Sequence, residues 1–206
     1  MTDVLLDVLE LSGVFTFALT GALVGVRKDL DVLGILVLAL VTGLGGGIVR
    51  DLLIGHVPPH ALEDWPLPAT ATAAAVVVYF LHGPVQRLGR SILLLDSIGL
   101  SVFCVSGTVA AAHAGLSVGA ATALGAVTAV GGGVIRDVLT AEVPLIFRGE
   151  LYALPALLGA LVSAVVEEAD GPAPLYLLAA ALCLVWRLLA VRRGWSAPSA
   201  WRRRAW

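Results

Sequence analysis

The 206-residue sequence predicts an all-α, polytopic membrane protein with seven transmembrane helices, arranged as two inverted three-helix repeats plus a seventh helix. Its hydrophobic fraction is 59%, only 14% of residues are charged, and the mean hydropathy is +0.96, unlike a soluble domain. The apolar residues form seven runs, most of them long enough to cross a bilayer, which takes about 17–25 residues. The string TGLGGGIVRDLLIGHVP (42–58) returns as TAVGGGVIRDVLTAEVP (128–144), with nine of seventeen positions identical.

The runs follow one another with short connections. They are expected at residues 4–26, 31–54, 67–82, 92–113, 117–140, 151–167 and 173–191. No Lys or Arg precedes the first run, which is therefore not typical of a cleaved signal peptide. The second and fifth runs end in the repeated string, the third and sixth are short, and the leucine-rich seventh is expected at the periphery of the bundle.

Basic residues predict the orientation in the membrane. With the N-terminus outside, all but one of the 13 Lys and Arg residues lie in inner connections or in the C-terminal tail. The exception is Arg50. Because Lys and Arg are retained on the cytoplasmic side, the sequence predicts an outer N-terminus and a cytoplasmic C-terminus, which requires an odd number of spans.

The two halves share more than the glycine string. Leu-Leu-Asp at 5–7 is matched with Leu-Leu-Asp at 94–96, and Gly83-Pro84 with Gly171-Pro172. Because each half holds three spans, the second half enters the membrane from the opposite side, which makes the repeats inverted. The predicted organisation is one transmembrane domain, 1–193, with repeat one at 4–84, repeat two at 92–172, the seventh helix at 173–191 and a basic cytoplasmic tail at 194–206.

Each copy of the repeated string contains three consecutive glycines within a span: Gly45, Gly46 and Gly47, then Gly131, Gly132 and Gly133. Three glycines destabilise a helix by roughly 3 kcal/mol relative to alanine. A kink or unwinding would free backbone carbonyls and amides, which inside a membrane need protein or water as partners. Two broken helices in matching halves are typical of a solute pathway. The alternative is that the glycines only allow two helices to cross closely.

An Arg-Asp pair follows each glycine triplet, as Arg50-Asp51 and as Arg136-Asp137. A charge near the bilayer centre costs about 2.5–3.5 kcal/mol on insertion scales, so these pairs indicate a functional role. They are expected to be gates or vestibule charges, one toward each mouth, pairing across the repeat axis. Snorkelling of each arginine to the headgroups is the alternative.

Four further polar residues are candidates for the same pathway. Asp7 and Asp96 begin the first and fourth spans and could complete the charge pairs; otherwise they only stabilise helix N-termini. Thr42 and Thr128 lie one turn before the triplets, where a hydroxyl would face a cavity or bond to its own helix carbonyl.

The remaining motifs point away from catalysis. The sequence has no H-E-x-x-H, G-x-S-x-G or P-loop motif, so no enzymatic activity is expected. Cys104 and Cys183 fit packing positions, and neither a cofactor, a metal site nor a nucleic-acid partner is expected. His56 and Glu142 occupy matching positions; His56 is either pH-sensitive or a solvated polar residue.

The doubled G-G-G-x-x-R-D…V-P pattern in a chain of this length resembles the prokaryotic trimeric intracellular cation channels, a bacterial and archaeal membrane family with a "glycine transporter" domain name. The resemblance implies a homotrimer with one mainly potassium-permeable pore in each subunit. The pore would lie between the repeats, lined by the glycine-kinked second and fifth helices and flanked by the four matched Arg and Asp residues. It also implies a bacterial inner membrane or an archaeal plasma membrane.

The sequence is therefore consistent with three functions. The first is a monovalent-cation channel with potassium as the permeant ion. The second is a secondary transporter of a small zwitterion such as glycine, since inverted repeats and broken helices also occur in transporters. The third is a membrane scaffold, which gains nothing from two weakened helices. Anionic lipid is the partner expected for the arginine-rich tail.

Overall fold

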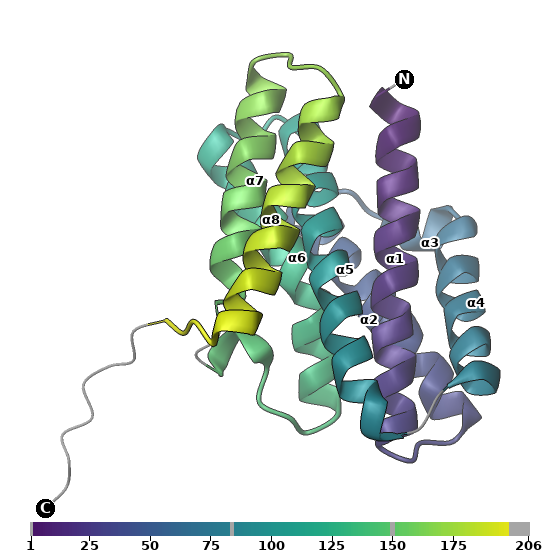
Figure 1. The fold of residues 1–206 in the computed structure, drawn as a ribbon. Coiled ribbons are helices and arrows are strands. Elements are labelled where there is room, and N and C mark those ends of the chain that lie inside the picture. Colours follow the sequence, from purple (N-terminus) through teal and green to yellow (C-terminus); the bar gives the residue numbers. More distant parts are fainter. Residues whose placement is uncertain (1, 83–84, 149–150, 198–206) are drawn as a thin grey trace, which may run out of the picture.

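The computed structural model describes residues 2–82, 85–148 and 151–197, and these are almost entirely helical (Figure 1). The predicted repeat boundary at Gly83-Pro84 and the arginine-rich end of the tail lie outside the described residues. In chain order the elements are α1 (Thr2–Arg27), α2 (Val32–Leu53), α3 (His60–Glu63), α4 (Pro66–Leu81), α5 (Val85–His113), α6 (Val118–Leu139), η1 (Leu145–Phe147), α7 (Ala153–Glu168) and α8 (Pro174–Arg193).

Every predicted apolar run corresponds to one long helix. The largest difference is at α5, which begins at Val85 instead of at residue 92. The segment before residue 92 contains Arg87 and Arg90, which the predicted orientation places in an inner connection. A helix needs backbone hydrogen bonds rather than apolar side chains, so it extends beyond the run that hydropathy detects.

Five of these helices, α1, α2, α5, α6 and α8, are long and apolar enough to cross a membrane. The other two, α4 and α7, have 16 residues each. At a rise of about 1.5 Å per residue such a helix spans about 24 Å, less than a hydrocarbon core of about 30 Å.

Two helices form the centre of the bundle. α1 packs against α2, α4 and α5, while α5 packs against α1, α6, α7 and α8 (Figure 1). They meet through Phe17 and Phe103, whose stacked rings have centroids 5.4 Å apart. A Cβ added at Gly13 would approach Phe103, and one added at Gly99 would approach Phe17, each within 3.3 Å. The two glycines therefore allow α1 and α5 to approach with an aromatic ring on each side.

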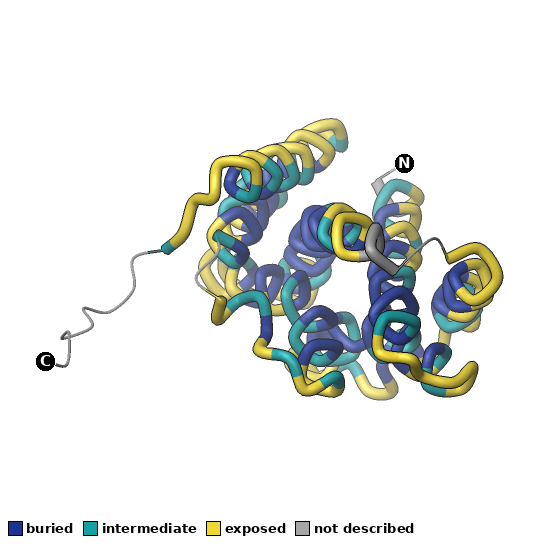
Figure 2. The backbone as a smooth tube through the Cα atoms, turned by 60° about the horizontal axis from the view of Figure 1, so that its bottom comes forward, coloured by how far each residue is buried: buried dark blue, intermediate teal, exposed yellow. Residues whose placement is uncertain are grey.

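Burial decreases from this centre outward. Of the most apolar stretch of α5, 78% is buried, against 28% for α8. The tube in Figure 2 is mostly buried near the middle of the bundle, and α8 carries a long exposed outer face. The predicted peripheral position of the seventh helix is therefore confirmed.

α2 and α6 cross at the glycine triplets without losing helical structure. Residues 45–47 and 131–133 are α-helical, so the unwinding expected at these glycines does not occur. A Cβ at Gly46 would overlap the carbonyl oxygen of Thr128, and a Cβ at Gly132 would overlap that of Thr42. Because the two backbones touch, the alternative reading of close helix crossing accounts for Gly46 and Gly132.

Alanine scanning of the first triplet tests this contact. Gly46→Ala should lower the free energy of unfolding by about 1–3 kcal/mol, because its Cβ meets backbone that cannot move aside. Gly47→Ala is the matched control, since the nearest atom to its added Cβ is a side-chain nitrogen of Arg50 at 4.0 Å. It should be neutral or stabilising by up to about 1 kcal/mol. Thermal unfolding in detergent measures both, and equal destabilisation of the two variants would contradict the backbone contact.

Candidate functional site

Arg50 and Arg136 lie in the last turns of α2 and α6, and both are almost completely buried. The side chain of Arg50 is 3% exposed and that of Arg136 is 2% exposed, which excludes snorkelling to solvent within the subunit. α2 and α6 end at opposite ends of the bundle, so the arginines lie on either side of the glycine crossing (Figure 1). We call these the Arg50 end and the Arg136 end.

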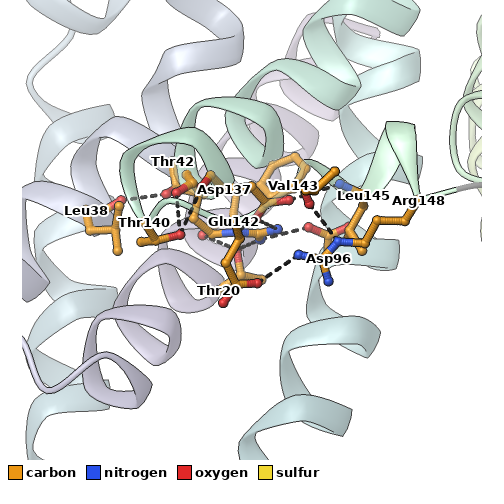
Figure 3. A network of polar contacts seen from close by, with 12 residues as sticks. Thr20, Leu38, Thr42, Asp96, Asp137, Thr140, Glu142, Val143, Leu145 and Arg148 are labelled. Carbon is orange, nitrogen blue, oxygen red and sulfur yellow. Dashed lines mark hydrogen bonds and ion pairs between the residues drawn. The ribbon is translucent and has the colours of Figure 1, made fainter.

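At the Arg136 end the guanidinium is surrounded by acceptors from three helices. Its Nη1 donates to Asp96 Oδ1 of α5 at 2.8 Å and to Thr20 Oγ1 of α1 at 2.9 Å. Its Nε donates to Asp137 Oδ1 at 2.9 Å. Figure 3 shows Thr20, Asp96 and Asp137 converging from these separate helices. A buried charge is tolerated when it is paired and hydrogen-bonded in this way.

At the Arg50 end two carboxylates again hold the guanidinium, with Glu10 in the place of Asp96. Arg50 Nε donates to Asp51 Oδ1 at 2.8 Å, and its Nη2 lies 3.0 Å from Glu10 Oε1 of α1. The side chain of Asp51 is 1% exposed, while that of Glu10 is 25% exposed. One carboxylate at this end therefore reaches solvent, whereas at the Arg136 end both are buried.

The second oxygen of each aspartate holds the segment that follows its helix. Asp51 Oδ2 accepts from the backbone N–H of His60 at 2.9 Å, and Asp137 Oδ2 accepts from that of Leu145 at 3.1 Å. Each aspartate therefore joins its own arginine to the connection beyond the Val-Pro sequence. The Arg and Asp of each motif bond to each other, so the prediction of pairing across the repeat axis is wrong.

Matched contacts recur between residues 86 positions apart, such as Thr42 and Thr128 or Arg50 and Arg136. At this spacing Glu10 corresponds to Asp96, and each of them pairs with the arginine of its own half. Asp7 is exposed, so its predicted role in completing a charge pair is wrong. The prediction paired Asp7 with Asp96 because Leu-Leu-Asp occurs at both places. That match is shifted by three residues, nearly one helical turn, from the spacing of 86 residues that relates the other contacts.

The two threonines lie in the crossing itself. Thr42 Oγ1 donates to Leu38 O at 2.6 Å, and Thr128 Oγ1 donates to Leu124 O at 2.8 Å. Both hydroxyl protons are thus directed to their own helices, the alternative considered from the sequence. Each side chain also packs against a glycine of the preceding helix, Thr42 against Gly21 and Thr128 against Gly107.

Cavities adjoin both arginines. At the Arg136 end a cavity of about 210 Å³ is lined by Arg27, Arg136, Asp137, Glu142 and Arg148, among others. At the Arg50 end a cavity of about 10 Å³, roughly one water molecule, touches Glu10, Gly47 and His60. The larger cavity is bordered by Glu142, whose carboxylate lies 2.7 Å from Arg27, 3.1 Å from Lys28 and 2.9 Å from Arg148.

Sequence reasoning missed several of these contributors. Glu10 was overlooked because the alignment favoured Asp7, and the constant spacing to Asp96 was the signal that could have identified it. Tyr152 was missed as well: its buried hydroxyl lies 3.0 Å from the position of a Cβ on Gly133, near Asp96. No short sequence pattern predicts that Tyr152 lies near Asp96, because the two residues are far apart in the chain. Among the described residues, no group of three or more His, Cys, Asp or Glu side chains could hold a metal ion.

Comparison with known proteins agrees with this architecture. The sequence profile of the family described as "Glycine transporter" matches the chain twice, at residues 7–83 and 93–168. UPF0126 membrane protein SCO4104 of Streptomyces coelicolor is 45% identical over 192 residues, covering 92% of this chain and 88% of the relative. UPF0126 inner membrane protein YadS of Escherichia coli K12 is 36% identical over 157 residues, 76% of each protein.

Two solved structures share the fold. One, described as the structural basis for conductance through TRIC cation channels, superposes with a TM-score of 0.86 at 37% identity over 97% of this chain and 98% of that one. The TRIC trimeric intracellular cation channel orthologue from Rhodobacter sphaeroides gives 0.87 at 36% identity over 92% and 98%.

Helices, buried charges and relatives together define a multi-pass helical membrane protein. The chain belongs to the "Glycine transporter" family, that of the prokaryotic TRIC-type proteins.

Substitutions of Asp96 and Asp7 test which of these two aspartates belongs to a buried charge pair. Asp96→Asn should lower the free energy of unfolding by about 1.5–3 kcal/mol, because it replaces a charged partner of the buried Arg136 by a neutral one while Asp137 still pairs with the guanidinium. Asp7→Asn alters an exposed carboxylate and should change stability by no more than about 0.5 kcal/mol. Thermal unfolding in detergent measures the difference, and a similar loss in both variants would refute the assignment.

Proposed function

We propose that this protein is a cation channel whose path runs within one subunit, beside the crossing of α2 and α6. The observation that carries the proposal is the pair of buried arginines, one at each end of the crossing, each held by two carboxylates. Among the groups bonded to each arginine there is therefore one more carboxylate than guanidinium. At the Arg136 end the basic neighbours of Glu142 offset this difference, so the net negative charge of the path lies at the Arg50 end. A net negative charge in a low-dielectric surrounding attracts cations and repels anions.

The glycine residues reduce the number of side chains in the middle of this path. Gly131 lies against the Cα of Gly46, while Gly45 lies against the side chain of Ile135, so the crossing is bordered by backbone and by this isoleucine. Since both helices are α-helical there, the proposed path does not rely on unwound backbone to coordinate the ion. Potassium is the proposed permeant ion, passing in hydrated form and with little discrimination from sodium.

The arrangement described here corresponds to a closed path. The backbones of Gly46 and Thr128 touch, and Arg50 and Arg136 fill the two ends. Opening requires α2 and α6 to separate and at least one guanidinium to leave its carboxylates. The charge pairs then act as gates, because their hydrogen bonds must be exchanged for water before an ion can pass.

Three further features of the proposal concern architecture. Seven transmembrane helices form two inverted repeats, supported by the two profile matches, which begin at residues 7 and 93, and by the matched contacts of Arg50 and Arg136. The chain forms a homotrimer, supported by the trimeric description of the Rhodobacter sphaeroides relative. The N-terminus lies outside, supported by the distribution of Lys and Arg. No enzymatic role is proposed, since the structural relatives are described as channels.

Planar-bilayer recording under a potassium chloride gradient tests the channel directly. Discrete current steps reversing near the potassium equilibrium potential are expected, with only a small shift when sodium replaces potassium on one side. Silent membranes, together with saturable glycine counterflow in proteoliposomes, would instead establish the secondary transporter of a small zwitterion. If neither current nor glycine counterflow were observed, the result would support the membrane scaffold.

Neutralising the exposed carboxylate tests the charge at the Arg50 end. Glu10→Gln should reduce cation selectivity and conductance at low salt, because it removes one negative charge from this end while Asp51 still holds Arg50. Asp170→Asn, in the exposed loop between α7 and α8, is the control and should not change either quantity. Reversal potentials at low and high salt provide the measurement; equal behaviour of the two variants contradicts the proposal.

A further inference from the structure

Two histidines are stacked beside the Arg50 end. His56 follows α2 and His60 begins α3, and their rings lie 3.9 Å apart at an interplanar angle of 11°. Both side chains are accessible to water, His56 being 38% and His60 41% exposed. Protons from solvent can therefore reach both rings.

Each ring also contacts a carboxylate. His60 Nδ1 lies 3.2 Å from Asp51 Oδ2, the same oxygen that accepts the backbone N–H of His60. His56 Nε2 lies 3.2 Å from Glu63 Oε2, at the end of α3. The two histidines thus bridge the end of α2 and the short helix beside the small cavity at Arg50.

This geometry does not suit a metal ion. Lone pairs of imidazole nitrogens lie in the plane of the ring, so two parallel stacked rings direct them side by side instead of at a common point. A proton needs only one nitrogen, and each ring already has a carboxylate to stabilise the charged form.

The charged groups around the stack determine what protonation does. Asp51 bonds to Arg50, and Arg50 bonds to Glu10 of α1, so the cluster joins Glu10, Arg50, Asp51 and Glu63. With neutral imidazoles, these three carboxylates and one guanidinium carry a net charge of two negative. With both imidazoles protonated, the net charge is zero.

We propose that His56 and His60 form a proton-binding site at the Arg50 end, and that acid on that side reduces cation entry by removing the negative charge of this mouth. The proposal rests on the channel function proposed above. The two sites interact, because a second positive charge must be placed 3.9 Å from the first.

The opposite end provides an internal comparison. The position matched with His56 is Glu142, which lies between Arg27, Lys28 and Arg148. Desolvation raises the pKa of Glu142, but hydrogen bonds from Arg148 and Lys28 and the charge of Arg27 outweigh it and lower this pKa to about 2. Because a depressed pKa keeps the carboxylate charged until the pH falls toward that value, mild acid leaves the charge of Glu142 unchanged. The response to pH should be one-sided.

Single-channel conductance in planar bilayers tests the site, with each chamber acidified in turn from about pH 7.5 to about pH 5, where histidine gains its proton. The conductance should fall about twofold or more when one chamber is acidified and should not respond to the other. The fall should be large at about 0.05 M KCl and small at about 1 M, where the screening length is only about 3 Å.

Two variants identify the groups responsible. His56→Gln/His60→Gln should lose the response to acid. His113→Gln is the matched control: His113 also pairs with a carboxylate, Glu167, but lies outside the cluster, and its variant should respond as the native protein does. Equal responses from both chambers, or a response that persists in the double variant, would overturn the proposal.

A readout that does not depend on current separates this proposal from the channel function. NMR of the histidine rings in detergent micelles should show that His60→Gln changes the response of the His56 ring to acid, because the two rings are in contact, whereas His113→Gln does not. Silent bilayers with this dependence between the two rings would refute the channel and retain the proton site. A His56 ring that responds identically in the native protein and in His60→Gln would refute the proton site, whatever the bilayers show.

Discussion

The backbone contact between α2 and α6 is the constraint on which the rest of the structure depends. At Gly46 and Gly132 each helix lies against a carbonyl of the other, at a distance that no side chain would permit. Inside a membrane, helices gain little from the hydrophobic effect when they associate, so close packing and weak contacts between backbones must hold them together. The crossing brings the two halves together and fixes where the helix ends, with their charges, come to lie.

The Arg-Asp pairs stabilise the ends of the two helices that the crossing positions. Each aspartate accepts from its own arginine through one oxygen and holds the following connection through the other. A buried arginine thereby becomes part of the structure at the end of its helix. The carboxylates of the Arg50 end also give the proposed path its negative charge, so the interactions that close that end are also those that attract cations to it. The two ends differ in the segment that follows each helix. At the Arg50 end this segment contains the stacked histidines, and at the Arg136 end it contains Glu142 with its three basic neighbours.

Much of the helical architecture could be predicted because hydropathy acts locally. The limits of α2 and α6 fall within one residue of those expected, since an apolar run must be helical to satisfy its backbone in a membrane. The candidate site was predicted less completely. Arg50, Asp51, Arg136, Asp137 and Asp96 lie where charges meet, but Asp7 does not. On a helix, an error of three residues still leaves a residue on nearly the same face, so a local match of three letters could not distinguish Asp7 from Glu10.

The sequence by itself determined the helical class, the order of the helices and the presence of two charged positions after two glycine triplets, because hydropathy and repetition are properties of neighbouring residues. Only the tertiary structure decided what the glycines do. Helix propensity predicts a break at three glycines, but the loss of about 1 kcal/mol per glycine is offset when a second helix packs against the bare backbone. It also decided which carboxylate each arginine binds, because that choice depends on how α1 and α5 are positioned against the ends of α2 and α6.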